Sequence, residues 1–143
     1  VTAVISLWQE TLGITIQPVV IDPFIYYDEL YAGNTGNLYS SGWCADYPDP
    51  QNFLDILYHS DSPQNIGRYV NPQVDALLAQ ARTEPDVATR LAQYAEIERR
   101  IVADAPVIFV SHGLQAALVS PDLDGYVLTP LGVRQWHRVG VDR

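Results

Sequence analysis

Residues 42–50 read GWCADYPDP, and these nine positions hold a tryptophan, the single cysteine of the chain, two aspartates and two prolines. The segment LYSSGW, residues 38–43, reads as a short strand, and the loop with its two prolines leads from that strand into a helix. Helices and strands that alternate with tight turns are typical of an α/β layer. Ligands of open α/β sheets bind beyond the carboxyl ends of the strands. The stretch therefore predicts an α/β fold class, a layered sheet with flanking helices, and a site at this turn.

Helix signals follow the stretch on its C-terminal side. Asp49-Pro50 and Asn71-Pro72 each combine a capping residue with a proline at the start of a helix. Thr83-Glu84-Pro85-Asp86 resembles a capping box, in which Thr83 would cap the next helix and Asp86 would take the acidic role. The apolar residues that this helix is expected to turn inward are Leu91, Tyr94, Ala95, Ile101 and Val102.

The N-terminal side continues the same alternation. A helix is expected up to Gly13, where a C-terminal cap favours positive φ, and a second helix after Asp22-Pro23, ending at Gly33. Besides residues 38–43, strands are expected over 14–21, 106–113 and 114–120, where β-branched and other apolar residues dominate. The last residues, 126–143, show no clean hydrophobic period.

The composition narrows the class of partner. The chain has 143 residues, of which 48% are hydrophobic, as in an ordinary globular domain. Its formal net charge is −9, and all eight of its basic residues are arginines. Nucleic acid and anionic lipid are therefore poor partners, because both require a cationic surface.

The side chains of the stretch suit a ligand that carries an ammonium group. Asp46 follows the expected strand end, where a partly desolvated carboxylate needs a cation or hydrogen-bond donors. Trp43 offers a flat apolar wall with one N–H donor, and Gly42 allows close approach of another backbone. The alternative is structural: Asp46 could bond to the backbone of its own turn, and Trp43 could belong to the core. Asp49 is most simply the cap of the next helix.

Catalytic and metal chemistry find little support. Nothing places His112 near Cys44 as a thiol hydrolase would require, and no nucleophile elbow or phosphate-binding loop is present. The spacing of His59, His112 and His137 is not that of metal ligands. We therefore expect no enzyme activity, no catalytic residues, no metal and no cofactor.

Four segments follow one another along the chain: YSSGWCADYPDPQNFL, NIGRYVNPQVDALLAQAR, ATRLAQYAEIERRIVADAPVIFV and LVSPDLDGY. In this order they resemble the C-terminal part of family 5 extracellular solute-binding proteins, the receptors of peptide and nickel ABC importers. The resemblance implies part of one lobe of a two-lobed type II periplasmic-binding-protein fold, on the periplasmic or extracellular face of the cytoplasmic membrane. Residues 1–125 would form the partial C-terminal lobe, and residues 126–143 would return toward the N-terminal lobe.

The resemblance also implies a function, the capture of a peptide or other small solute for the permease subunits of an ABC importer. Asp46 would bind the ligand's ammonium group, Trp43 would border a side-chain pocket, and backbone around Gly42 and Cys44 would pair with an extended peptide. His112 could line the cleft from a strand end, although a structural role is the simpler alternative. The expected ligand-binding residues are Asp46, Trp43, Cys44, Gly42, Tyr47 and His112.

Two departures from the family pattern leave the ligand open. Phe109 stands where relatives often carry a second proline, and the residues before Gly42 contain no cation for a peptide's carboxylate. A non-peptide solute, such as a nickel complex or a sugar, is therefore the alternative. A Cys44-dependent hydrolase and a protein-interaction module are further alternatives. Some relatives pair the cysteine of this motif with an earlier one, which leaves the redox state of Cys44 open.

The chain by itself is expected to behave as an incomplete receptor. A cleft with one wall leaves the ammonium–carboxylate pair exposed to water, where such pairs contribute about 0–1 kcal/mol. Peptide binding by the isolated chain should therefore be weak or absent. An unpaired sheet edge also invites pairing with another chain, so we expect self-association to a dimer or a higher species.

Overall fold

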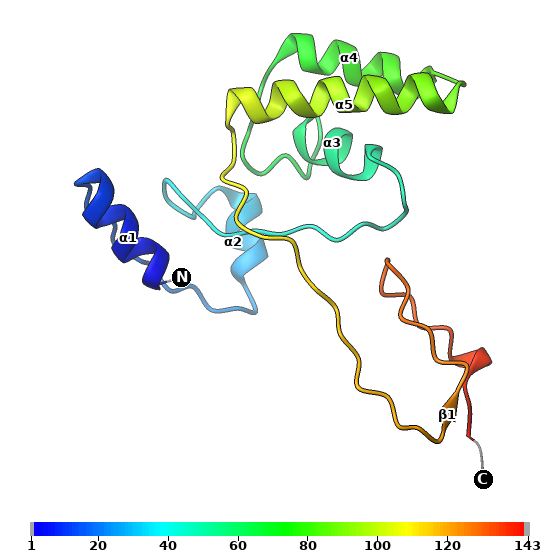
Figure 1. Cartoon of the computed structure of the whole chain (residues 1–143). Helices are drawn as coiled ribbons and strands as arrows, with labels where there is room; N and C mark the ends of the chain where they lie inside the picture. The colour runs from blue at the N-terminus through cyan, green and yellow to red at the C-terminus, as the bar shows by residue number, and fades with distance from the viewer. Residues whose placement is uncertain (1, 142–143) are drawn as a thin grey trace. The chain divides into compact units, whose positions relative to one another are not determined.

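The structure is a computed structural model that describes residues 2–141. Its elements are α1 Thr2–Leu12, α2 Tyr26–Ala32, α3 Gln51–Tyr58, α4 Pro72–Thr83, α5 Val87–Asp104, β1 Leu123–Asp124, the 3-10 turn Trp136–Arg138 and β2 Gly140–Val141 (Figure 1). The chain divides into two compact units between Tyr39 and Ser40. The first unit holds α1 and α2, and the second holds the other elements.

The first unit confirms both expected helix ends. α1 is followed by Gly13 at φ +64°, and its N–H donates to the carbonyl of Gln9 over 3.1 Å. α2 is followed by Gly33 at φ +79°. Asp22 does not cap α2 directly. Its carboxylate accepts from the N–H of Phe24 in a turn, and the helix begins only at Tyr26.

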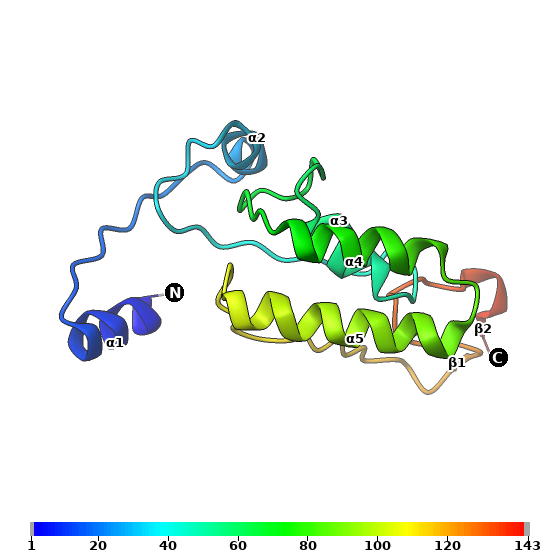
Figure 2. The ribbon, with the colours of Figure 1, turned by 90° about the horizontal axis from the view of Figure 1, so that it is seen from above.

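The second unit contains a layer of three helices. α5 packs along α4, and α3 packs against both, as Figure 2 shows from above. The buried apolar residues of this layer are Leu54 on α3, Val74, Leu78 and Ala81 on α4, and Tyr94, Ile97 and Ile101 on α5. The Asn71 cap is confirmed, because its side chain accepts from the N–H groups of Gln73 and Val74. Burial of this shared apolar face is the main favourable free energy that holds the three helices together.

The expected capping box is wrong, because the N-cap of α5 lies three residues after Thr83. α4 runs through Thr83, and Asp86 is itself the N-cap of α5, accepting from the N–H of Thr89 over 2.8 Å. The hydrogen bonds from Thr89 lower the pKa of Asp86. The cause of the break is Pro85, which disfavours helical backbone at Glu84 before it; Glu84 is extended, with ψ 113°.

The inward face of α5 also differs from the expected one. Tyr94 and Ile101 are buried as predicted, whereas Leu91, Ala95 and Val102 are exposed. At about 100° per residue, these three lie roughly a quarter turn around the helix from the buried stripe. α3 and α4 cover only the stripe that contains Ile97. The sequence thus carries two adjoining apolar stripes, and this layer buries one of them.

The expected strands depend on partners elsewhere in the chain, and they differ most from the structure. Residues 14–21, 38–43 and 106–120 carry no regular secondary structure. Within residues 2–141, the ladder that forms is the antiparallel pair β1–β2, with Leu123 opposite Val141. A strand exists only when another backbone satisfies its N–H and C=O groups. The helices of the predicted layer are therefore present, while the strand segments have no sheet partner among the described residues.

A polar cluster ties one end of α4 to the end of α5. Tyr69 Oη donates to Asp104 Oδ2 over 2.5 Å, and Asn71 Nδ2 donates to the same oxygen over 2.7 Å. Partial burial, together with the neighbouring Asp104 carboxylate, raises the pKa of Tyr69 to about 12. The two hydrogen bonds lower the pKa of Asp104.

In the part of the chain that the structure describes, no helix is long and apolar enough to cross a bilayer.

An ion pair with a buried carboxylate joins α3 to α4. The Asp55 side chain is 2% exposed and accepts two hydrogen bonds from the guanidinium of Arg82, whose side chain is 46% exposed. Gln51 Nε2 donates to Asp55 as well, over 3.1 Å. Burial alone raises the pKa of Asp55, but the hydrogen bonds from Arg82 and Gln51 outweigh it and hold the pKa below its ordinary value.

The core assignment predicts a contrast between two leucines. Leu78→Ala should lower the free energy of unfolding by about 2–5 kcal/mol, because it removes a fully buried side chain and leaves a cavity. Leu91→Ala, at a side chain that is 44% exposed, should cost less than about 1 kcal/mol. Urea unfolding followed by circular dichroism measures both. Equal losses would contradict the assignment of the core.

The Asp55–Arg82 pair predicts a pH-dependent loss. Because the folded-state pKa of Asp55 is lowered, its contribution is present above the ordinary carboxyl pKa near 4 and disappears as the pH falls through the folded value. Arg82→Gln strands a buried carboxylate and should cost about 2 kcal/mol at neutral pH, between the values for buried and exposed pairs.

Acid should shrink that cost, since protonation of Asp55 removes the stranded charge. Arg99→Gln is the matched control, because Arg99 pairs with Glu96 at an exposed position of α5. Urea midpoints from pH 7 to pH 3 test the difference. A cost of Arg82→Gln that stays constant with pH would refute the role given to the buried charge.

Candidate functional site

The loop of residues 42–50 is held by one buried side chain, the amide of Asn52 in the first turn of α3. Asn52 is 0% exposed. Its Oδ1 accepts from Trp43 Nε1 over 2.9 Å and from the backbone N–H of Asp46 over 3.0 Å. Its Nδ2 donates to Asp46 Oδ2 over 3.2 Å. The indole and the carboxylate that the sequence singled out are thus both bonded to one amide group.

Asp49 forms the second anchor of the loop. Its Oδ1 accepts from the N–H of Gln51, the first residue of α3, over 3.0 Å, but the N-cap position is Pro50, so the expected Asp49 cap is one residue too early. Its Oδ2 lies 2.6 Å from Nη1 of Arg90 on α5. That hydrogen bond raises the pKa of Arg90. The structure thus pairs Arg90 with a residue that is distant in sequence.

The side chain of Asp46 is exposed, and its bond to Asn52 occupies one of its two carboxylate oxygens. No arginine pairs with it among residues 2–141. A carboxylate held in this way is a fixed acceptor for a cationic group from outside the chain. The carboxylate bonds to the side chain of Asn52 on α3 rather than to the backbone of its own turn, and it stays open to solvent.

The other predicted residues of the loop lie around this pair. Trp43 is half-buried, the Cys44 thiol is free and exposed, and the Tyr47 hydroxyl donates to Gln51. A Cβ added at Gly42 would meet nothing within 4 Å. The packing of this chain therefore does not itself require the glycine, which leaves room there for another backbone.

His112 is the predicted site residue that lies apart. It is exposed in the irregular segment 106–120. Within the described residues, no hydrogen bond or ion pair joins it to the loop of residues 42–50, and no group of three or more His, Cys, Asp or Glu is placed to hold a metal ion. A place for His112 in the site stays a prediction.

Asn52 is the residue that the sequence reading missed. In the sequence it is one polar residue in the first turn of an amphipathic helix, a position where polar side chains are ordinary. Its one signal in the sequence is its place two residues after a loop that holds a Trp donor and an Asp.

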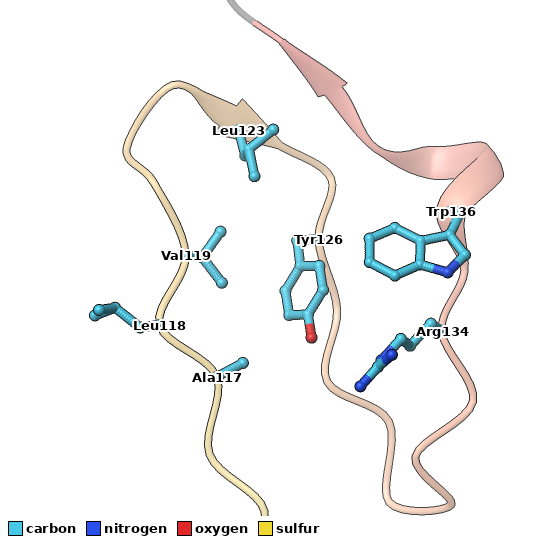
Figure 3. Close-up of a pocket in the computed structure, with 7 residues that line it drawn as sticks. All are labelled: Ala117, Leu118, Val119, Leu123, Tyr126, Arg134 and Trp136. Carbon is cyan, nitrogen blue, oxygen red and sulfur yellow. The ribbon is translucent and has the colours of Figure 1, made fainter.

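A hollow lies between residues 117 and 136 (Figure 3). Its volume is about 260 Å³, and its lining residues are Ala117, Leu118, Val119, Leu123, Tyr126, Arg134 and Trp136. The Tyr126 and Trp136 rings lie 6.2 Å apart, and the Arg134 guanidinium lies 5.9 Å from the Trp136 ring. Gly125 makes the turn possible, because at φ +73° a Cβ would lie 2.0 Å from the carbonyl oxygen of Arg138. None of the predicted site residues lines this hollow.

The chain was compared with known proteins. Models of protein families gave no match. Among curated proteins, the periplasmic oligopeptide-binding protein OppA of Escherichia coli K12 is 32% identical over 85% of this chain and 22% of its own length. The periplasmic murein peptide-binding protein MppA of the same strain is 35% identical over 87% of this chain and 23% of its own length. Heme-binding protein A of Haemophilus influenzae is 31% identical over 92% of this chain and 24% of its own length.

Solved structures give the same result for the fold. The murein tripeptide-binding protein MppA of E. coli matches 99% of this chain and 28% of its own chain, with a TM-score of 0.84 and 31% identity. The periplasmic binding protein DppA of Helicobacter pylori, in complex with the peptide STSA, matches 92% of this chain and 27% of its own, with a TM-score of 0.70 and 25% identity.

The solved structures define the class of the protein: the chain has the fold of part of one lobe of a type II periplasmic binding protein. It belongs to the family 5 extracellular solute-binding proteins, as a segment that spans 22% of the length of the OppA relative. The names of the relatives place them in the periplasm, and the expected extracytoplasmic location is confirmed. The relatives named above are, by their names, binding proteins.

The second anchor predicts a local effect of Arg90. Arg90→Gln releases Asp49, and the N–H of Gln51, which donates to Asp49, should then exchange with solvent faster, because the loop opens more readily without this pair. Arg100→Gln, which removes an exposed partner of Glu96 on the same helix, is the matched control. Hydrogen exchange read by NMR measures both, and equal protection of Gln51 in all three proteins would contradict the anchor.

Proposed function

We propose that the chain contributes the ligand-capturing site of an extracytoplasmic receptor for peptides, with Asp46 accepting the ammonium group at the peptide's N-terminus. The observation that carries the proposal is the exposed carboxylate of Asp46, which no arginine of the described chain neutralises and which the buried Asn52 holds in place. A peptide ammonium supplies both the positive charge and the N–H donors that such a carboxylate lacks.

The neighbouring residues suit the rest of a peptide. Gly42 offers open space to an approaching backbone, and neither Gly42 nor Cys44 belongs to a ladder among the described residues. An extended peptide could pair with their N–H and C=O groups in the manner of an added strand. Trp43 and Tyr47 give this edge aromatic surface for the first side chains, and their polar ends are bonded to Asn52 and Gln51.

The charge of the chain supports the same class of ligand. A formal net charge of −9 attracts ligands with a free ammonium group and disfavours ligands that are anionic overall. A non-peptide solute is the second candidate, because one relative is named for heme and is 31% identical to this chain. A hydrolase based on Cys44 is not proposed, since within the described residues no histidine is bonded to that exposed thiol.

The partners follow from the family. We propose that the complete receptor delivers its ligand to the permease subunits of an ABC importer, and that residues 126–143 return toward its other lobe. By itself the chain presents one wall of the cleft, and exposed apolar residues such as Val20, Leu114 and Leu118 stay uncovered. Weak peptide binding and self-association of the isolated chain are therefore part of the same proposal.

The test compares Asp46→Asn with Asp61→Asn in the complete receptor that contains this segment. Asp61 is an exposed aspartate outside the loop of residues 42–50 and serves as the control. A hydrogen bond to a charged group is worth about 1.5–3 kcal/mol, so Asp46→Asn should weaken binding of a retained peptide about 10- to 150-fold, and Asp61→Asn should not.

The ligand is obtained by passing a casein hydrolysate over the receptor and identifying the retained short peptides by mass spectrometry. Calorimetry then measures each variant with one such peptide and with its N-acetylated form. Acetylation should weaken binding to the wild type strongly and to Asp46→Asn little, because both changes remove the same interaction. Unchanged peptide affinity in Asp46→Asn would sink the proposal.

A further inference from the structure

We infer that Asn52 is the positioning residue of the ammonium site: its buried amide fixes the carboxylate of Asp46 and the indole of Trp43 relative to each other before the ligand arrives. This inference rests on the proposed function and deepens it. It assigns to Asn52 no contact with the ligand, only the orientation of two side chains that would have one.

The hydrogen bonds define which way the amide faces. A side-chain amide has an oxygen with two acceptor positions and a nitrogen with two donor hydrogens. Both positions of Oδ1 are filled, by the indole N–H of Trp43 and the backbone N–H of Asp46. Rotation of the amide by half a turn would point N–H donors at N–H donors and would leave Asp46 Oδ2 without its donor. The orientation is therefore fixed by the network itself.

This arrangement leaves one carboxylate oxygen for the ligand. Asp46 Oδ2 accepts from Asn52 Nδ2 over 3.2 Å, and the carboxylate keeps further lone pairs, above all on Oδ1, that face solvent. A carboxylate on an unsupported loop would have to lose rotational freedom when it binds. A carboxylate that is already held loses less, and the saving appears as affinity.

One oxygen of Asn52 links Trp43 to Asp46. Trp43 and the backbone of Asp46 share Oδ1 as their acceptor. Movement of α3 or of the loop therefore shifts both together. A shorter residue such as Ser could not reach three partners, and Asp at this position would set a second carboxylate beside Asp46.

The charged groups around the amide are already committed to other partners. Asp49, from the same loop, is paired with Arg90 of α5. Asp55, one turn further along α3, is paired with Arg82 of α4. A change at Asn52 therefore acts on Asp46 and Trp43 first, and these pairs are expected to remain.

The second unit offers a matched control in Asn65. It is also a buried asparagine, and it likewise makes three hydrogen bonds: its Nδ2 donates to the carbonyls of His59 and Tyr69, and its Oδ1 accepts from the N–H of Tyr69. Its bonds hold the loop that precedes α4 and involve no predicted site residue. A purely structural loss should be similar at the two positions.

The first experiment needs no ligand and uses the chain itself. The indole N–H signal of Trp43 is assigned in a proton–nitrogen NMR spectrum by its disappearance in Trp43→Phe. In Asn52→Ala that signal should move and exchange with solvent at least about tenfold faster, because its acceptor is gone. In Asn65→Ala it should not change, and circular dichroism confirms that both variants fold. An indole signal unaffected by Asn52→Ala would overturn the inference.

The second experiment measures the pH dependence of peptide affinity in the complete receptor, with a peptide retained from the casein hydrolysate. Asn52→Asp sets a second carboxylate beside Asp46, so its affinity should depend on pH over a range in which the affinity of the wild type does not. Asn65→Asp should follow the wild-type profile. An Asn52→Asp profile that coincides with that of the wild type would also overturn the inference.

The two readouts separate the two proposals. If the wild-type receptor retains no peptide, the proposed function fails and the ligand-related half of this inference fails with it. The indole signal then still decides whether Asn52 holds Trp43. If peptide binds and Asn52→Asp behaves as the wild type, only the positioning role is lost.

Discussion

One buried amide group, that of Asn52, joins the loop of residues 42–50 to the helical layer. The candidate site in this loop depends on that group. A buried polar group must be bonded, and a fully bonded one defines a single local structure. Asn52 satisfies this condition by holding Trp43 and Asp46. The layer beneath holds Asn52 in turn, because α3 is anchored to α5 through Asp49 and to α4 through Asp55. The packing of the three helices therefore determines where the exposed carboxylate of Asp46 lies.

The helices were predictable because their signals are local. Gly13 and Gly33 end helices, and Asn71 begins one, for reasons contained within a few residues. Errors arose where two local rules competed. At Thr83 the capping pattern gave the wrong boundary because Pro85 acts on the residue before it, so that Asp86 became the cap.

The remaining differences concern contacts between elements. The sequence of α5 carries two apolar stripes, and only the positions of α3 and α4 decide which of them is buried. The strand segments need partners that are distant in sequence, and such partners cannot be read from a strand's own residues. Asn52 belongs to the same category, since its importance lies in burial and in three bonds to another segment. The sequence singled out residues 42–50 but not Asn52, the residue that holds them.

The central claim is that Asp46 is held ready for a positively charged group of the ligand. A crystal structure of the complete receptor with a bound peptide tests it most directly. The account predicts the peptide's terminal nitrogen within about 2.7–3.2 Å of an oxygen of Asp46, while Asn52 still donates to the other oxygen. A peptide whose ammonium group is bound elsewhere, with Asp46 turned away from it, would contradict the account.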